Sequence, residues 1–91
     1  GGSDTTATIL ADMLNAKKVE IYTDVDGVYS KDPKKYKDAI FYKNLTYQQA
    51  QNLSDNGAKI IHKNAIQYVK KKKIPIIIKN IISNEKSTII N

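Results

Sequence analysis

The chain has 91 residues, 41% of them hydrophobic and 26% charged, which suits one small folded domain and excludes a largely disordered chain. It has no cysteine and no apolar run of about 18 residues, which excludes disulfides, thiolate metal sites and a membrane-spanning helix. Its net charge of +6 comes from lysine alone. This charge indicates either a polyphosphate site or simply a lysine-rich composition. A nucleic-acid-binding surface is less favoured, because arginine normally makes the bidentate contacts there.

The first predicted element is a helix over residues 3–15. Ser3 is a suitable N-cap, Asp4 favours the positive end of the helix dipole, and apolar residues follow at helical spacing. Glycines such as Gly1 and Gly2 before a helix allow an anion to approach its free backbone N–H groups. Ser3 could then donate to a carboxylate or phosphate and Asp4 could orient a cationic catalytic group, although an ordinary N-cap explains the segment equally well.

A strand is predicted over residues 18–25, where apolar and polar residues alternate. Asp26-Gly27 is a strong turn signal, so residues 28–30 are expected to return as the second strand of a β-hairpin. Asp32-Pro33 then predicts a further turn.

The same segment carries the densest set of candidate binding groups. Ligands of α/β sheets bind where strands end, and Thr23 and Asp24 offer a donor and an acceptor there for a base or a ribose. Tyr29 offers a ring face, and Lys34 offers positive charge for a phosphate. The alternative is a β-hairpin whose polar side chains bind nothing.

Two helices are predicted next, over residues 46–56 and about 59–72. Thr46 is the N-cap of the first helix and Gly57 suits its C-terminus. The second helix ends in four lysines, which are expected to form a solvated end that complements the helix dipole. Lys59, near the start of that helix, could meet a nucleotide phosphate together with helix N–H groups, or it could be an ordinary solvated lysine.

The last predicted elements are strands over residues 74–78 and 87–90. The continuous apolar run of the first strand predicts burial on both faces, as in a parallel sheet. No metal site is predicted, because His62 is the only histidine and the carboxylates are scattered. The order of elements indicates a layered α/β fold whose first strand follows a helix, as if the chain were cut in mid-fold.

Together these segments resemble the aspartokinases of the amino-acid kinase family. The matching segments are, in order, GGSDTTA, VEIYTDVDGVYSKDP, LTYQQAQNLSDNGAKIIH, KIPIIIKN and STII, and they extend over essentially all 91 residues. Uridylate kinases share a segment like DGVYSKDP, whereas the GGSD start combined with GAKIIH is typical of aspartokinases. The resemblance implies a three-layer α/β fold with a mainly parallel sheet and a β-hairpin. Residues 1–91 would form its ATP-binding, C-terminal portion.

The resemblance also implies an activity. Aspartokinases transfer the γ-phosphoryl group of ATP, with Mg²⁺, to the β-carboxylate of L-aspartate, which begins the synthesis of lysine, threonine and methionine. The full-length protein would be a cytoplasmic homo-oligomer without nucleic-acid or membrane partners. The catalytic lysine belongs to the N-terminal half of the domain, so the isolated chain is expected to be inactive. A non-catalytic nucleotide-binding module that needs a partner chain, and a basic nucleic-acid-binding domain, stay open as alternatives.

By the same resemblance, the start of the chain would serve the amino-acid substrate. Ser3, with the backbone of Gly1 and Gly2, would bind aspartate. Asp4 would be the catalytic residue that positions the absent lysine.

The nucleotide would contact later segments. Thr23 and Asp24 would line the adenosine site, and Tyr29 would pack near it. Lys34 and Lys59 would approach the phosphates. Lys34 stands where the family usually has arginine, so it keeps the charge but loses the planar fork of a guanidinium group.

Overall fold

The computed structural model describes residues 2–56, 61, 63–83 and 85–91, with the backbone alone for residues 2–4. The helices and strands are, in chain order, α1 (Gly2–Leu14), β1 (Val19–Thr23), β2 (Val28–Tyr29), β3 (Phe41–Tyr42), β4 (Asn44–Leu45), α2 (Tyr47–Asp55), α3 (Lys63–Lys70), β5 (Ile76–Asn80) and β6 (Ser87–Ile90). The part of the chain that the structure describes has no helix long and apolar enough to cross a membrane.

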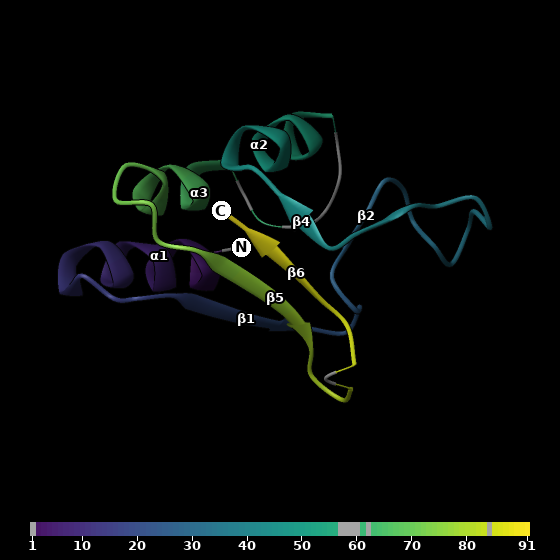
Figure 1. Cartoon of the computed structure of the whole chain (residues 1–91), viewed down its shortest axis with the longest axis horizontal. Coiled ribbons are helices and arrows are strands. Elements are labelled where there is room, and N and C mark those ends of the chain that lie inside the picture. Colours follow the sequence, from purple (N-terminus) through teal and green to yellow (C-terminus); the bar gives the residue numbers. More distant parts are fainter. Residues whose placement is uncertain (1, 57–60, 62, 84) are drawn as a thin grey trace.

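Among the described residues, four strands form the main sheet, in the order β1-β5-β6-β4. The pairs β1–β5 and β4–β6 are parallel and the pair β5–β6 is antiparallel, so the sheet is mainly parallel, as predicted. Val19, Ile76 and Ile90 lie in one row across three neighbouring strands. The sheet is therefore built from segments that are far apart in the sequence but side by side in space (Figure 1).

Helices α1, α2 and α3 lie together over one face of this sheet (Figure 1). Alternate strand residues point into the layer between helices and sheet, and they are buried: Val19, Ile21, Ile76, Ile78 and Ile90. The helices contribute buried side chains from the other side: Ala11, Ala50, Ala65, Ile66 and Val69. This apolar layer is the core of the described chain, and its burial stabilises the sheet and helices together.

The opposite face of the sheet is partly open. Tyr22 is 52% exposed, and Ile77 and Ile89 are only partly buried. The prediction that residues 74–78 are buried on both faces was therefore wrong, because no described element covers this second face. The continuous isoleucine run indicated burial by composition, while the structure alternates buried and half-buried residues along β5.

Helix ends agree with prediction where local capping decides them. Thr46 is the N-cap of α2: its Oγ1 accepts the N–H of Gln49 at 3.0 Å, while the N–H of Thr46 donates to Oε1 of Gln49 at 2.8 Å. This reciprocal pair is a capping box and confirms the predicted start. Gly57, predicted to follow the helix, lies outside the described residues, and Asn56 is the C-cap.

Two other helix ends were predicted wrongly. Helix α1 includes Gly2, so Ser3 lies within the first turn and is not the N-cap, since local signals locate a helix end only to within one or two residues. The helix predicted over about residues 59–72 corresponds to α3, which ends at Lys70; residues 59, 60 and 62 of its predicted start lie outside the described residues. Its early end has a backbone cause, because Lys73 adopts a φ of 56° and turns the chain toward β5.

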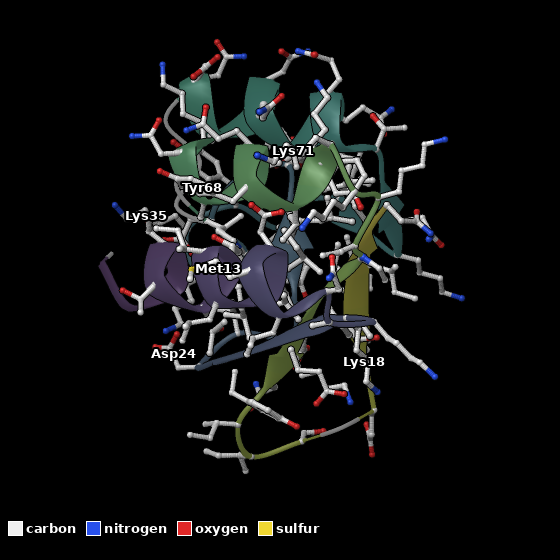
Figure 2. The ribbon with its side chains drawn as sticks, turned by 90° about the vertical axis from the view of Figure 1, so that its left-hand side faces the viewer. Met13, Lys18, Asp24, Lys35, Tyr68 and Lys71 are labelled. Atoms are coloured by element: carbon white, nitrogen blue, oxygen red, sulfur yellow. The ribbon has the colours of Figure 1, made fainter. Side chains whose placement is uncertain are left out.

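The lysine run after α3 is more than a solvated helix end. Nζ of Lys72 lies 3.0 Å from Oδ1 of Asp12, and Nζ of Lys71 lies 3.6 Å from Oδ2. The hydrogen bond from Lys72 is the main reason that the pKa of Asp12 is below its usual range. Lys71, labelled in Figure 2, directly follows the C-terminal end of α3. The run therefore links α3 to α1.

The predicted return strand pairs with a different partner. β2 does not pair with β1; it pairs antiparallel with β3, and the two strands form a short β2–β3 ribbon joined by the loop 30–40. The ribbon projects from the sheet, on the right in Figure 1. Asp26-Gly27 therefore does not join two strands of a β-hairpin, contrary to the prediction. A long-range contact directs β2 elsewhere, because the N–H of Val28 donates to the side chain of Thr88 on β6. Strands as short as β3 and β4 carry no periodic pattern, and the sequence did not predict them.

Candidate functional site

An open cleft of about 770 Å³ lies where β1 ends, between the β2–β3 ribbon, the loop 30–40 and the C-terminal end of α2. Four of the predicted nucleotide-binding residues line it: Thr23, Asp24, Tyr29 and Lys34. The structure thus brings together groups from a strand end, a ribbon and a loop. Lys59, the fifth predicted residue, lies outside the described residues. Apolar side chains also line the cleft, from the turn after β1, from α2 and from β5: Val25, Leu53 and Ile78.

Thr23 shapes the turn at the end of β1. Its Oγ1 accepts the N–H of Val25 at 2.8 Å and lies 3.2 Å from the Val25 carbonyl oxygen. The hydroxyl group is therefore bonded within its own turn. The neighbouring Asp24 is exposed and presents its carboxylate at this end of β1, opposite Lys18 at the other end (Figure 2). Asp24 is thus the more accessible acceptor of the two.

Tyr29 is held on two sides. Its ring packs on the Phe41 ring with a centroid separation of 5.1 Å and an interplanar angle of 59°. Its hydroxyl group lies 3.5 Å from Oδ2 of Asp26, and Oδ1 of Asp26 accepts a hydrogen bond from Nδ2 of Asn80 at 3.2 Å. The ring orientation therefore depends on both the ribbon and the end of β5.

Sequence reasoning missed Asp26 and Asn80 as supports of the site. Asp26 was interpreted only as a turn residue, and Asn80 was not considered. One signal could have found Asn80, because it is a polar residue at the carboxyl end of a buried strand, where α/β sheets bind ligands. Its Oδ1 also accepts the N–H of Ile82 at 2.8 Å, so Asn80 fixes two loops.

The loop 30–40 presents the positive charge of the cleft. Its predicted turn is confirmed: Oδ1 of Asp32 accepts the N–H of Lys34 at 2.9 Å, and the Asp32 carbonyl oxygen accepts the N–H of Tyr36 at 3.0 Å. Lys31 is already neutralised by an ion pair with Asp38 at 2.8 Å.

Lys34 and Lys35 remain available for a ligand. Both line the cleft and are exposed, and neither forms an ion pair with another described residue. Two unpaired ammonium groups beside a partly apolar hollow suit an anionic ligand that also carries an apolar or aromatic part. Lys35 was missed by sequence reasoning, although it directly follows Lys34 in the same basic run.

The predicted aspartate site is less fully described. Gly1 lies outside the described residues. Gly2, Ser3 and Asp4 belong to the first turn of α1, where the structure gives their backbone alone. Their roles toward a substrate therefore stay predictions.

The described residues contain no group of three or more side chains that could hold a metal ion. The cleft lies at the carboxyl end of the parallel strand pair β1–β5, the usual ligand position in α/β sheets. Fold and cleft together are typical of α/β domains that bind phosphorylated ligands.

Comparison with known proteins gives the family. Residues 1–80 match the amino acid kinase family, and the chain belongs to this family. The chain is 39% identical, over 90 residues, to an aspartokinase of Geobacillus stearothermophilus, an alignment that covers 99% of the chain and 22% of that protein. The resemblance to aspartokinases predicted from the sequence is confirmed.

Solved structures agree with this assignment. Aspartokinase III of E. coli, in a complex with aspartate and ADP, superposes with a TM-score of 0.92 at 31% identity, over 99% of the chain and 20% of that protein. UMP kinase of Ureaplasma parvum gives a TM-score of 0.83 at 27% identity, over 97% of the chain and 41% of that enzyme. These neighbours confirm the predicted amino-acid kinase fold. The chain spans only 9% to 22% of the length of the first curated relatives that it matches.

Proposed function

We propose that residues 1–91 are the ATP-binding, C-terminal portion of an aspartokinase catalytic domain. One observation carries this proposal: the four described residues predicted to bind nucleotide line one cleft, with Lys34 and Lys35 unpaired among the described residues. The similarity to E. coli aspartokinase III, which was solved with aspartate and ADP, supports the choice of ligands.

In the full-length enzyme, the γ-phosphoryl group of ATP would pass to the β-carboxylate of L-aspartate, the first step toward lysine, threonine and methionine, in the cytoplasm. Phosphoryl transfer depends mainly on positioning and charge neutralisation. The attacking carboxylate is already ionised at neutral pH, so no general base is required. Mg²⁺ would supply positive charge at the phosphates, held by the nucleotide, since the described residues offer no group of metal ligands.

Within the cleft, Asp24 and the ring of Tyr29 would contact the nucleoside, and Thr23 would hold the turn that presents Asp24. Lys34 and Lys35 would bind the phosphates as point charges. Lys59, which precedes α3 in the sequence, would approach the same phosphates.

At the start of the chain, Ser3 with the backbone of Gly1 and Gly2 would bind aspartate, and Asp4 would position a catalytic lysine. That lysine would come from the N-terminal half of the domain, which is the partner that this portion requires. The full-length protein would be a homo-oligomer.

The proposal is tested by titrating the isotopically labelled chain with Mg-ATP and following its amide resonances. We expect shifts concentrated at Thr23, Asp24, Tyr29 and Lys34. Replacing Lys34 by alanine should raise the Kd for Mg-ATP about fivefold, corresponding to the loss of one charge-assisted contact. Lys43→Ala is the matched control, because Lys43 is also exposed but lies outside the lining of the cleft.

A folded chain whose spectrum ignores Mg-ATP would contradict the proposal. Salt-sensitive binding of an oligonucleotide that Mg-ATP does not displace would favour the nucleic-acid alternative instead. We also expect no aspartate-dependent ADP formation by the isolated chain, and activity there would refute the assignment of the catalytic lysine to another segment.

A further inference from the structure

One buried hydroxyl group joins β6 to both strands of the β2–β3 ribbon. Thr88 is fully buried, and its Oγ1 accepts the N–H of Val28 at 2.8 Å and donates to the carbonyl oxygen of Tyr42 at 2.6 Å. Val28 and Tyr42 face each other in the ribbon register. The hydroxyl group therefore bridges the two strands at one point and uses its proton and a lone pair to do so.

The backbone beside this bridge is tightly packed. A Cβ atom added at Gly27 would collide with Oγ1 of Thr88 and would lie 3.0 Å from Cε2 of Phe41. Gly27 thus lets the chain pass directly against Thr88, where a larger residue would not fit.

The bridge lies next to the wall of the cleft. Gly27 and Tyr29 line the cleft, and Val28 between them is the residue that Thr88 holds. Phe41, adjacent to Tyr42, packs on the Tyr29 ring. A shift of the ribbon would therefore move the Tyr29 ring and the adjoining loop 30–40 with its lysines.

We propose that Thr88 is a positioning residue for nucleotide binding, which acts through the ribbon and touches no ligand itself. Thr88 is fully buried and lies outside the lining of the cleft, so it acts only by fixing Val28 and Tyr42. This inference rests on the proposed nucleotide-binding function.

The test compares two variants at Thr88 by Mg-ATP titration. Thr88→Val keeps the shape of the side chain but removes both hydrogen bonds, and it should raise the Kd for Mg-ATP about tenfold. Thr88→Ser keeps the hydroxyl group and should bind within about twofold of the wild type.

Thr8→Val is the matched control. Thr8 is equally buried, but its hydroxyl group donates to the Thr5 carbonyl oxygen within α1, at 3.0 Å. It should leave the Kd for Mg-ATP within about twofold of the wild-type value.

The outcomes separate the two proposals. Absence of Mg-ATP binding by the folded wild-type chain overturns the proposed function and this inference with it. Normal binding by the wild type and by Thr88→Val overturns the inference alone.

If Thr88→Val does not fold, hydrogen exchange in the wild type decides. If Thr88 positions the ribbon, ligand binding favours the state in which the Val28 N–H donates to Thr88. Saturating Mg-ATP should therefore slow exchange of the Val28 amide about tenfold more than that of the Ala11 amide in α1. Equal slowing at both amides would refute the role of Thr88.

Discussion

The helix-covered side of the sheet and the β2–β3 ribbon are held in place by different forces. In the first region, Ile66, Ile76 and Ile90 are fully buried between helices and strands, and non-directional apolar burial stabilises them. The ribbon strands have two residues each, and most of the loop 30–40 is exposed. Of the ribbon's strand residues only Val28 is fully buried in the core, so directional contacts contribute more here, chiefly the Thr88 bridge and the Tyr29–Phe41 ring contact.

This difference predicts two kinds of response to substitution. Loss of a core side chain should weaken every element packed on it, because the helices and the sheet share one apolar layer. Loss of a ribbon contact should open the cleft locally and leave the core folded, as expected for the less stable units of a domain. If so, the proposed binding groups Tyr29, Lys34 and Lys35 would lie in the region expected to open without unfolding the rest.

The largest effect is expected from Ile76→Ala in the central strand β5. Removing this fully buried side chain should lower the free energy of unfolding by about 3 kcal/mol, through lost burial and the cavity left behind. Urea denaturation measures the change. Ile77→Ala is the control on the same strand, and its half-buried side chain should give about 1 kcal/mol. Equal losses would disprove the one-sided burial of β5.

Gly27→Ala should have the next largest effect, confined to the ribbon. The added methyl group would collide with Thr88 and Phe41, which should destabilise the ribbon by about 2 kcal/mol. Hydrogen exchange should accelerate at Val28 and its neighbours in the ribbon, while amides of α3 keep their protection. Equal acceleration in α3 would show that ribbon and core open together, and it would remove the distinction drawn above.

Tyr47→Phe tests a single polar contact inside the core. The Tyr47 hydroxyl group is buried and donates to the Ile74 carbonyl oxygen at 2.6 Å, so its removal should reduce the free energy of unfolding by about 1 kcal/mol. Tyr36→Phe, at a half-exposed tyrosine, is the control and should change little.

Tyr47 also predicts a pH dependence, because burial raises its pKa above the usual value. A raised pKa favours the neutral phenol in the folded state, so this contribution is complete below the ordinary pKa of tyrosine, about 10, and is lost as pH rises through the folded value. The difference between the ultraviolet titrations of the wild type and Tyr47→Phe should show a tyrosine that ionises above its ordinary pKa. A difference curve centred at or below the ordinary pKa would contradict this.

The smallest effect is expected at Glu20 on the open face of the sheet. A hydrogen bond from Lys18, at 3.0 Å, and a second from the Tyr22 hydroxyl group lower the pKa of Glu20 to about 2. A lowered pKa stabilises the folded chain above the ordinary value of 4.5, and this contribution is lost as pH falls toward 2. NMR titration of the Glu20 side chain should give this pKa at low salt. A pKa near 4.5 would show that the contacts are absent in solution.

The sequence was most informative where neighbouring residues decide the structure. The α2 cap depends on Thr46 and Gln49, three residues apart, and both capping bonds were within reach of pattern analysis. Strand β6 was also predicted with its exact bounds. Thr23 and Asp24 were predicted at the end of a strand, where α/β sheets bind ligands, and Tyr29 in the segment that follows; all three line one cleft.

Contacts between distant segments were not predicted from the sequence. The pairing of β2 with β3 depends on Thr88, which is 60 residues from Val28. The same applies to the Asn80–Asp26 hydrogen bond, which spans 54 residues. The sequence around Thr88 and Asn80 does not indicate their hydrogen-bond partners, since a buried threonine or a strand-end asparagine can bond in many ways.

The position of β6 has a consequence for how the chain acquires its structure. β6 follows the other described strands in the sequence, yet it lies inside the sheet between β5 and β4. During synthesis, β4 must wait for β6 before it gains its partner in the sheet, and β1 must wait for β5. Pairing over such separations is slow, and unpaired strand edges attract other chains. The described sheet and the wall of its cleft are therefore completed together, once β6 has left the ribosome.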